Sequence, residues 1–78
     1  MSDATHVVYD VPDVSCDHCK MAIEGAVAGV EGVDRVVVDV ATKRVEVDFD
    51  GGRVDAERIA AVIAEEGYAV AGVHAIEG

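Results

Sequence analysis

Residues 33–49 read V-D-R-V-V-V-D-V-A-T-K-R-V-E-V-D-F, and this stretch decides the fold. Apolar and polar residues alternate on both sides of a short link, Ala41-Thr42, as they do in strands with one buried face. The alternation predicts one strand over 33–40 and a second over 43–49. Because the link is short, the two strands are predicted to form a hairpin. The residues expected to face the core are Val36, Val38, Val40, Val45, Val47 and Phe49.

A helix is predicted on each side of this hairpin. Before it, from about residue 18 to residue 30, apolar residues recur at helical spacing. After it, Asp55 is well placed to cap a helix that runs to about Glu66. Each helix is followed by a glycine and then at once by a strand, in V-E-G-V at 30–33 and in E-E-G-Y at 65–68. The chain therefore contains two similar halves of about 35 residues.

Two outer strands complete the pattern, one over 6–11 (H-V-V-Y-D-V) and one over 68–76. The resulting order, βαββαβ, matches the ferredoxin-like arrangement. This is an α+β fold in which a four-stranded antiparallel sheet carries two helices on one face, and the other face is more polar. A length of 78 residues allows one domain. We assign that domain to residues 1–78, with its core at about 6–76.

The predicted topology places residues that are distant in sequence close together. Right-handed crossovers make the first two strands parallel, and likewise the last two, so the first and last strands run antiparallel. Cys16, just after the first strand, should then lie near Tyr68, at the start of the last. The opposite ends of the same strands should bring His6 and His74 together, on the order of 17–20 Å from the cysteines.

Charge and hydropathy exclude several classes of partner. The net charge is −10, from 16 acidic and 6 basic residues, and such a surface repels nucleic acid and anionic lipid. It suits a cation or a partner with a basic face, although solubility or a salt-adapted host explains it equally well. No apolar run reaches the roughly 18–20 residues that cross a bilayer. The polar start lacks the features of a secretory signal, so we expect no membrane insertion and a cytoplasmic location.

The two cysteines, Cys16 and Cys19, form a single C-x-x-C on the turn between a strand and a helix. A small secreted scaffold would carry more cysteines at wider spacing, so this pair indicates a metal site or a redox site. Cys19 falls in the first helical turn, where the helix dipole favours an anion and lowers a thiol pKa. Two thiolates without further strong ligands suit Cu(I), whereas structural zinc requires four ligands.

Three stretches together resemble the heavy-metal-associated domain family: V-P-D-V-S-C-D-H-C at 11–19, V-E-G-V-D-R-V-V-V-D-V at 30–40, and E-E-G-Y at 65–68. The resemblance covers roughly residues 6–73. The family includes small copper chaperones, the cytosolic metal-binding domains of copper-transporting P-type ATPases, and mercury-carrying relatives. A lone C-x-x-C is weak evidence, but its conjunction with the strand order and the glycine-led strand starts is specific.

The resemblance implies that Cys16 and Cys19 are the metal ligands, with Cys16 the more exposed. It also implies that the protein is not an enzyme but a copper chaperone. Such a chaperone would hold one Cu(I) per chain and pass it by thiolate exchange to a P-type ATPase metal-binding domain of the same fold. We expect a monomer, with a metal-bridged dimer as the alternative.

Three neighbouring residues qualify this site. Val14 stands where the family usually has Met, commonly a buried support for the loop, so the rigidity of the loop is in question. His18 is a third ligand, a bridge in a metal-linked dimer, a modulator of thiolate basicity, or simply a solvated loop residue. Tyr68, where bacterial chaperones of this type often carry Tyr, shields the ion, forms a hydrogen bond near a thiolate, or only packs at a strand start.

Two other functions remain open at this stage. The fold could carry another soft ion, Hg(II), Zn(II) or Cd(II), because two thiolates discriminate poorly among them. A low-pKa C-x-x-C at a helix start is also typical of a thiol–disulfide oxidoreductase. That class expects a proline beside its active site at the start of a later strand, and Pro12 is the one proline here.

Overall fold

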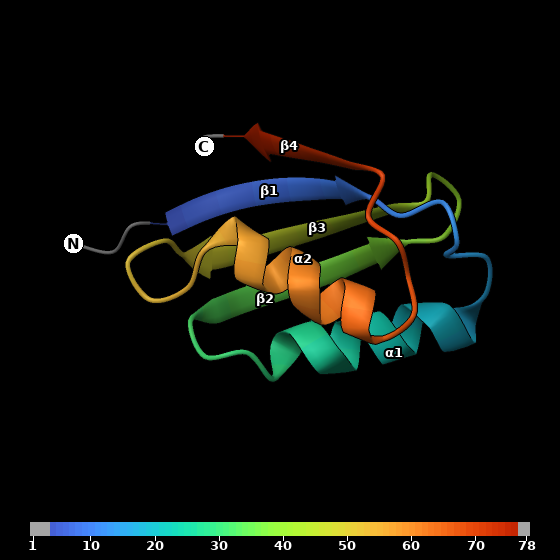
Figure 1. Cartoon of the computed structure of the whole chain (residues 1–78), viewed down its shortest axis with the longest axis horizontal. Coiled ribbons are helices and arrows are strands. Elements are labelled where there is room, and N and C mark those ends of the chain that lie inside the picture. The colour runs from blue at the N-terminus through green and yellow to red at the C-terminus, as the bar shows by residue number, and fades with distance from the viewer. Residues whose placement is uncertain (1–3, 77–78) are drawn as a thin grey trace.

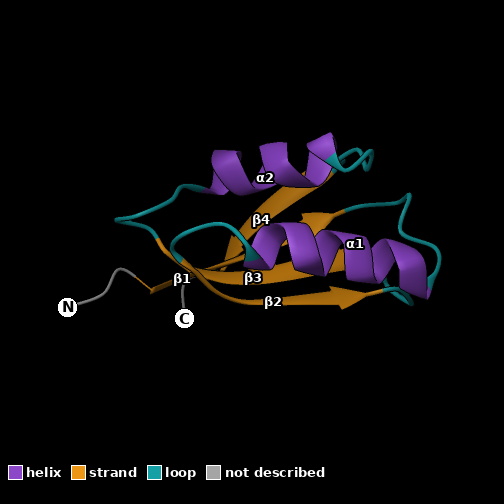
Figure 2. Cartoon of the chain, turned by 90° about the horizontal axis from the view of Figure 1, so that it is seen from below, coloured by secondary structure: helices purple, strands orange, loops and turns teal. Residues whose placement is uncertain are grey.

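The sheet has the strand order β2-β3-β1-β4, and every neighbouring pair is antiparallel (Figure 1). The computed structural model describes residues 4–76. Its elements are β1 (Ala4–Asp10), α1 (Asp17–Ala28), β2 (Val33–Asp39), β3 (Arg44–Asp50), α2 (Ala56–Glu65) and β4 (Gly72–Ile76). Both helices cover the same face of the sheet (Figure 2). The predicted ferredoxin-like α+β fold is confirmed, including the parallel relation of β1 to β2 and of β3 to β4.

The core lies between this face and the helices, and the alternation in the sequence explains it. Val45, Val47 and Phe49 of β3 are all buried, as predicted, while the residues between them are more exposed. The helices contribute Ile23, Val27, Ile59, Val62 and Ile63. The inward side chains of the central strands β1 and β3 belong to one core cluster with residues of both helices. Neither helix within 4–76 has the length and apolar character that crossing a bilayer requires.

Tyr9 connects the central sheet to the second helix. Its side chain is fully buried, and its hydroxyl donates a hydrogen bond to the Ala56 carbonyl at 2.8 Å. Burial raises the pKa of Tyr9 to about 12. The hydrogen bond satisfies a polar atom that would otherwise be costly to bury, so β1 and the start of α2 are fixed relative to each other.

The last strand is shorter than the sequence suggested, and the prediction of its start at Tyr68 is wrong. β4 begins at Gly72, which lies opposite Asp10 at the end of β1. Beyond Asp10 the partner strand offers no further ladder, and Pro12 lacks an N–H. Residues 68–70 therefore have no strand to pair with, Ala71 makes one backbone hydrogen bond to Asp10, and Tyr68 packs instead against the core.

The first helix also ends differently from the prediction. α1 stops at Ala28, with Gly29 as its C-cap in ordinary helical geometry. Gly32, the glycine predicted to follow this helix, lies beyond the C-cap and has a φ of +99° in the turn that leads into β2. A Cβ there would come within 3.0 Å of Arg53 and Val54, so both the backbone angle and the space require glycine.

The open face of the sheet carries His6 and His74, and the register places them as diagonal neighbours rather than directly opposite each other. His74 lies opposite Val8, two positions from His6 in the register, and the two imidazoles have different partners. His6 Nδ1 lies 2.5 Å from an Asp48 oxygen, and this hydrogen bond raises the pKa of His6. His74 Nε2 lies 2.9 Å from an Asp10 oxygen. Each histidine thus contacts carboxylates on a neighbouring strand, and the two imidazoles share none of them.

Candidate metal centre

Three segments that are distant in sequence meet at one end of the sheet (Figure 1): the β1–α1 loop, the β2–β3 turn, and residues 66–71 between α2 and β4. Backbone hydrogen bonds join them to the end of β1. The Val11 N–H donates to the Lys43 carbonyl at 2.9 Å, and the Ala71 N–H donates to the Asp10 carbonyl at 2.8 Å. Because β1 is central, it gathers both outer segments around the loop that carries the cysteines.

The two cysteine sulfurs lie 3.4 Å apart, and both thiols are free. Cys16 occupies the N-cap of α1 and Cys19 its first turn, so the backbone turn that opens the helix brings the side chains together. Cys16 is exposed and Cys19 is half-buried. At this separation both sulfurs can reach one ion with metal–sulfur bonds of about 2.3 Å. Of the two sulfurs, that of Cys16 is therefore the more accessible to solvent.

Hydrogen bonds favour the thiolate form of Cys19. A hydrogen bond from the Ser15 backbone, then one from the Tyr68 hydroxyl, then one from Cys16 lower the pKa of Cys19 to about 7. The same contact raises the pKa of Tyr68, because the phenol donates to the sulfur. The direction of the Cys19 shift agrees with the prediction, but its main causes are specific donors rather than the helix dipole alone.

Tyr68 therefore lies where the topology placed it, beside the cysteine pair, although it precedes β4 by several residues. His18 is exposed and forms no side-chain hydrogen bond or ion pair with any residue in 4–76. Over the same range, no three side chains of His, Cys, Asp or Glu are arranged to hold a metal ion. The donor set that the described chain presents is thus the two thiols, with Tyr68 adjacent.

Two features of the site were not identified from the sequence. One is the Ser15 backbone, because main-chain donors leave no mark in a sequence. The other is Lys43 of the β2–β3 turn, whose ammonium donates to the Val14 carbonyl at 3.2 Å. Val14 itself is fully buried beneath the loop, so an apolar support is present where the family usually has Met.

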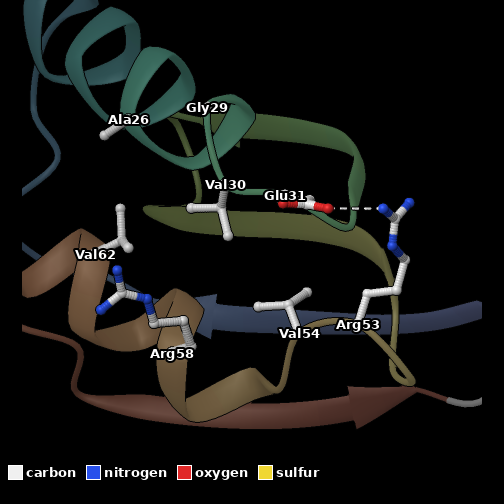
Figure 3. Close-up of a pocket in the computed structure, with 8 residues that line it drawn as sticks. All are labelled: Ala26, Gly29, Val30, Glu31, Arg53, Val54, Arg58 and Val62. Carbon is white, nitrogen blue, oxygen red and sulfur yellow. Dashed lines mark hydrogen bonds and ion pairs between the residues drawn. The ribbon is translucent and has the colours of Figure 1, made fainter.

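A hollow of about 490 Å³ lies between the two helices at the end away from the cysteines (Figure 3). It is bordered by the C-terminal end of α1 and the N-terminal part of α2, and an ion pair of 2.8 Å between Arg53 and Glu31 closes one side. Val30 and Val54 form part of its floor (Figure 3). No thiol or imidazole lines it, so it offers nothing that a soft metal ion would select.

Comparison with known proteins agrees with this geometry. The profile of the heavy-metal-associated domain matches residues 8–69. The chain belongs to the heavy-metal-associated domain family. The resemblance seen in the sequence is thereby confirmed.

Several members of the heavy-metal-associated family are similar over most of the chain. Copper chaperone CopZ of Staphylococcus haemolyticus (strain JCSC1435) is 41% identical over 63 residues, which are 81% of this chain and 93% of CopZ. A solved structure of a CopZ metallochaperone has a TM-score of 0.81 and 31% identity, covering 83% of this chain and 97% of that one. A copper-binding domain from HMA7, a P-type ATPase, has a TM-score of 0.82 and 25% identity, covering 94% and 95%.

Proposed function

We propose that this chain is a copper chaperone that carries one Cu(I) between Cys16 and Cys19. The observation that supports this most directly is the pair of free thiols 3.4 Å apart at the start of α1, one of them exposed. Cu(I) is a soft ion that prefers thiolates and accepts few ligands. The similarity to CopZ supports copper as the cargo rather than Hg(II), Zn(II) or Cd(II).

The two cysteines have different parts in the transfer. Cys19, held by the Ser15 backbone and the Tyr68 hydroxyl, is the thiolate that keeps the ion in place. Cys16 is exposed, so an incoming thiolate approaches from its side and replaces it on the metal. Each exchange forms one copper–sulfur bond and breaks another, and copper remains Cu(I) throughout. The proton of the incoming thiol passes to solvent or to the departing sulfur.

The acceptor in this proposal is the metal-binding domain of a P-type ATPase. The likeness of this chain to a copper-binding domain of a P-type ATPase supports transfer between two copies of one architecture. In this proposal the transfer takes place in the cytoplasm, and the chaperone acts as a monomer. No chemical conversion of a substrate is involved, and the role is transport rather than catalysis.

The site is tested by competition for Cu(I) against a chromophoric chelator under reducing conditions. The unaltered protein should withdraw one Cu(I) per chain, and Cys16→Ser and Cys19→Ser should each largely abolish this. Val73→Ser is the control, because it changes an exposed residue on β4 and should bind as the unaltered protein does. Equal affinity in all four proteins would refute the assignment of the ligands.

Delivery is tested by mixing the Cu(I)-loaded chain with an isolated ATPase metal-binding domain, separating the two, and measuring copper in each. Copper should redistribute between them, and retention of all copper by the chaperone would contradict the role. Repeating the competition with Hg(II), Zn(II) and Cd(II) establishes the cargo. Turnover in an insulin-reduction assay would instead indicate a thiol–disulfide oxidoreductase.

A further inference from the structure

Lys43 adopts an unusual backbone conformation at the β2–β3 turn. Its φ is +59°, and it is the one non-glycine residue within 4–76 whose φ is positive. A lysine in this left-handed region is strained, whereas Gly, Asn or Asp accepts it at little cost. The turn is stabilised without the Lys43 side chain, because the Asp39 carboxylate accepts hydrogen bonds from the N–H groups of Ala41 and Thr42. Turn formation alone therefore does not require a lysine at this position.

Both ends of Lys43 contact the loop that carries the cysteines. Its carbonyl accepts a hydrogen bond from the Val11 N–H at 2.9 Å. Its ammonium donates to the Val14 carbonyl at 3.2 Å in a partly buried position. The Val14 N–H in turn donates to the Val11 carbonyl at 3.1 Å, which closes a tight turn around Pro12. One residue thus fixes both ends of the segment between β1 and the cysteines.

A shallow hollow of about 270 Å³ separates the start of this loop from the turn. Pro12 lines one side of it, and Thr42, Lys43 and Arg44 line the other. Apolar side chains do not fill this space, so packing does not join the loop to the turn here. The hydrogen bonds of Lys43 cross it, beside an ion pair of 3.4 Å between Arg44 and Asp10, and of these contacts only those of Lys43 reach the loop beyond β1.

The Val14–Ser15 peptide group transmits this connection to the thiol pair. A peptide group is planar, so fixing the Val14 carbonyl also fixes the Ser15 N–H on the opposite side of the same plane. The N–H is the only donor that the Ser15 backbone has, and the backbone of Ser15 forms a hydrogen bond with Cys19. A chain of contacts therefore leads from the Lys43 ammonium through one rigid plane to a cysteine sulfur.

We propose that Lys43 is a positioning residue that holds the metal-binding loop through the Val14–Ser15 peptide group. It compensates for the smaller support that Val14 provides, and it explains why a strained lysine occupies the turn. This inference rests on the proposed function only in calling the loop metal-binding. The mechanical link between Lys43 and the loop stands or falls without copper.

The first test is amide hydrogen exchange of the copper-free protein, followed residue by residue by NMR. Lys43→Met keeps the backbone strain and the long side chain but removes the donor, and it should speed exchange at Ser15 and Cys16 by about tenfold or more. Lys43→Arg keeps a cationic donor and should restore slow exchange. Arg35→Met is the matched control, since it removes an exposed cation from β2 and should leave these amides unchanged. Unaltered exchange in Lys43→Met would overturn the inference.

A second variant separates positioning from stability. Lys43→Asn relieves the backbone strain, so it should raise Tm by a few degrees while still speeding loop exchange. A residue with a merely structural role would move both quantities in the same direction. If Cu(I) is bound, its release to the chelator should be faster in Lys43→Met and Lys43→Asn than in Lys43→Arg. A failure of the unaltered protein to bind Cu(I) would sink the proposed function and leave the exchange result intact.

Discussion

The two helices of this chain begin with similar backbone geometry and differ in the residue at the N-cap. Cys16 and Asp55 are both extended, with φ and ψ of −155° and 171° for the first and −110° and 166° for the second. The Asp55 carboxylate accepts a hydrogen bond from the Arg58 N–H at 2.7 Å, whereas the Cys16 side chain caps nothing. The two halves of the fold are equivalent in topology, so the two N-caps can be compared directly. The first half lacks a side-chain cap, which typically contributes about 1 kcal/mol to stability.

This difference shows how one architecture separates stability from reactivity. The helix does not engage the sulfur of Cys16, so this sulfur is free to contact the second thiol and, in the proposed function, to bind an ion. α1 is instead held by its buried residues Ile23 and Val27, and by the Glu24 carboxylate, which accepts a hydrogen bond from the Val38 N–H at 3.2 Å. The first half therefore relies on tertiary contacts where the second half uses a local cap.

The largest expected effect comes from making the two helix starts alike. Cys16→Asp should lower Cu(I) affinity by ~10³-fold or more, because one of two thiolates is lost. The same change should raise the unfolding free energy of the copper-free protein by about 0.5–1 kcal/mol, because α1 gains a cap. Chelator competition and urea unfolding measure the two effects, with Cys16→Ala as the variant that loses metal without gaining a cap. If the Cu(I) affinity of Cys16→Asp stayed within tenfold of that of the unaltered protein, the difference between the two helix starts could not be explained by metal binding.

The next effect tests whether the two halves share one core. Ile23→Ala in α1 and Ile59→Ala in α2 both truncate fully buried side chains, so each should cost about 2–5 kcal/mol. The exposed Met21 of α1 is the control, and Met21→Ala should stay within about 0.5 kcal/mol. Urea unfolding measures all three, and the corresponding Ile→Val variants, at about 0.5–1.5 kcal/mol, serve if an alanine variant does not fold. A much smaller loss at Ile23 would mean that α1 does not depend on the core.

A smaller effect is expected at the capped helix. Asp55→Ala should lower the unfolding free energy by about 1 kcal/mol with no change in the urea m-value, and Asp55→Asn should retain most of the stability. Cu(I) affinity should not change in either variant, because α2 begins at the end of the sheet away from the cysteines. Weakened Cu(I) binding in Asp55→Ala would show that the two helix starts are not independent.

The last expected effect concerns pH. Folding lowers the pKa of Cys19 from 9.0 to about 7, chiefly through the Ser15 backbone and then the Tyr68 hydroxyl. Below pH 7 the thiol is protonated in both states and contributes nothing. Between pH 7 and pH 9 the folded protein loses this proton first, so stability of the copper-free protein should rise with pH and level off above pH 9. Thiolate absorbance should show a midpoint near 7 that Tyr68→Phe moves upward, and an unmoved midpoint would contradict the hydrogen bond.

Much of this fold could be predicted from the sequence because burial of one face leaves a periodic mark. The alternation through Val45, Val47 and Phe49 gave both the strand and its inward face. The start of β4 could not be obtained in this way. Tyr68 and Val70 are as apolar as strand residues, but a strand also needs a partner, and β1 has ended by that point. Whether a partner exists is a property of the assembled sheet rather than of the segment.

The same distinction, between local pattern and assembled structure, applies to the candidate metal centre. The cysteine pair and the nearby Tyr68 follow from spacing and topology, and the structure brings them together. The same topology predicted that His6 and His74 lie together, and the register makes them diagonal neighbours whose imidazoles bond to different carboxylates. Lys43 was missed because its role depends on a long-range contact and a backbone angle. No local pattern records either of these.

The register of β1 and β4 has a consequence for how this domain can be joined to others. His6 lies opposite Ile76, whereas Asp10, next to the cysteine loop, lies opposite Gly72. The start of β1 and the end of β4 therefore both lie at the end of the sheet that is farthest from the cysteine sulfurs. A surface, a dye or a further copy of the domain that is attached through the start of β1 or the end of β4 is therefore held at the end of the sheet opposite the cysteine sulfurs.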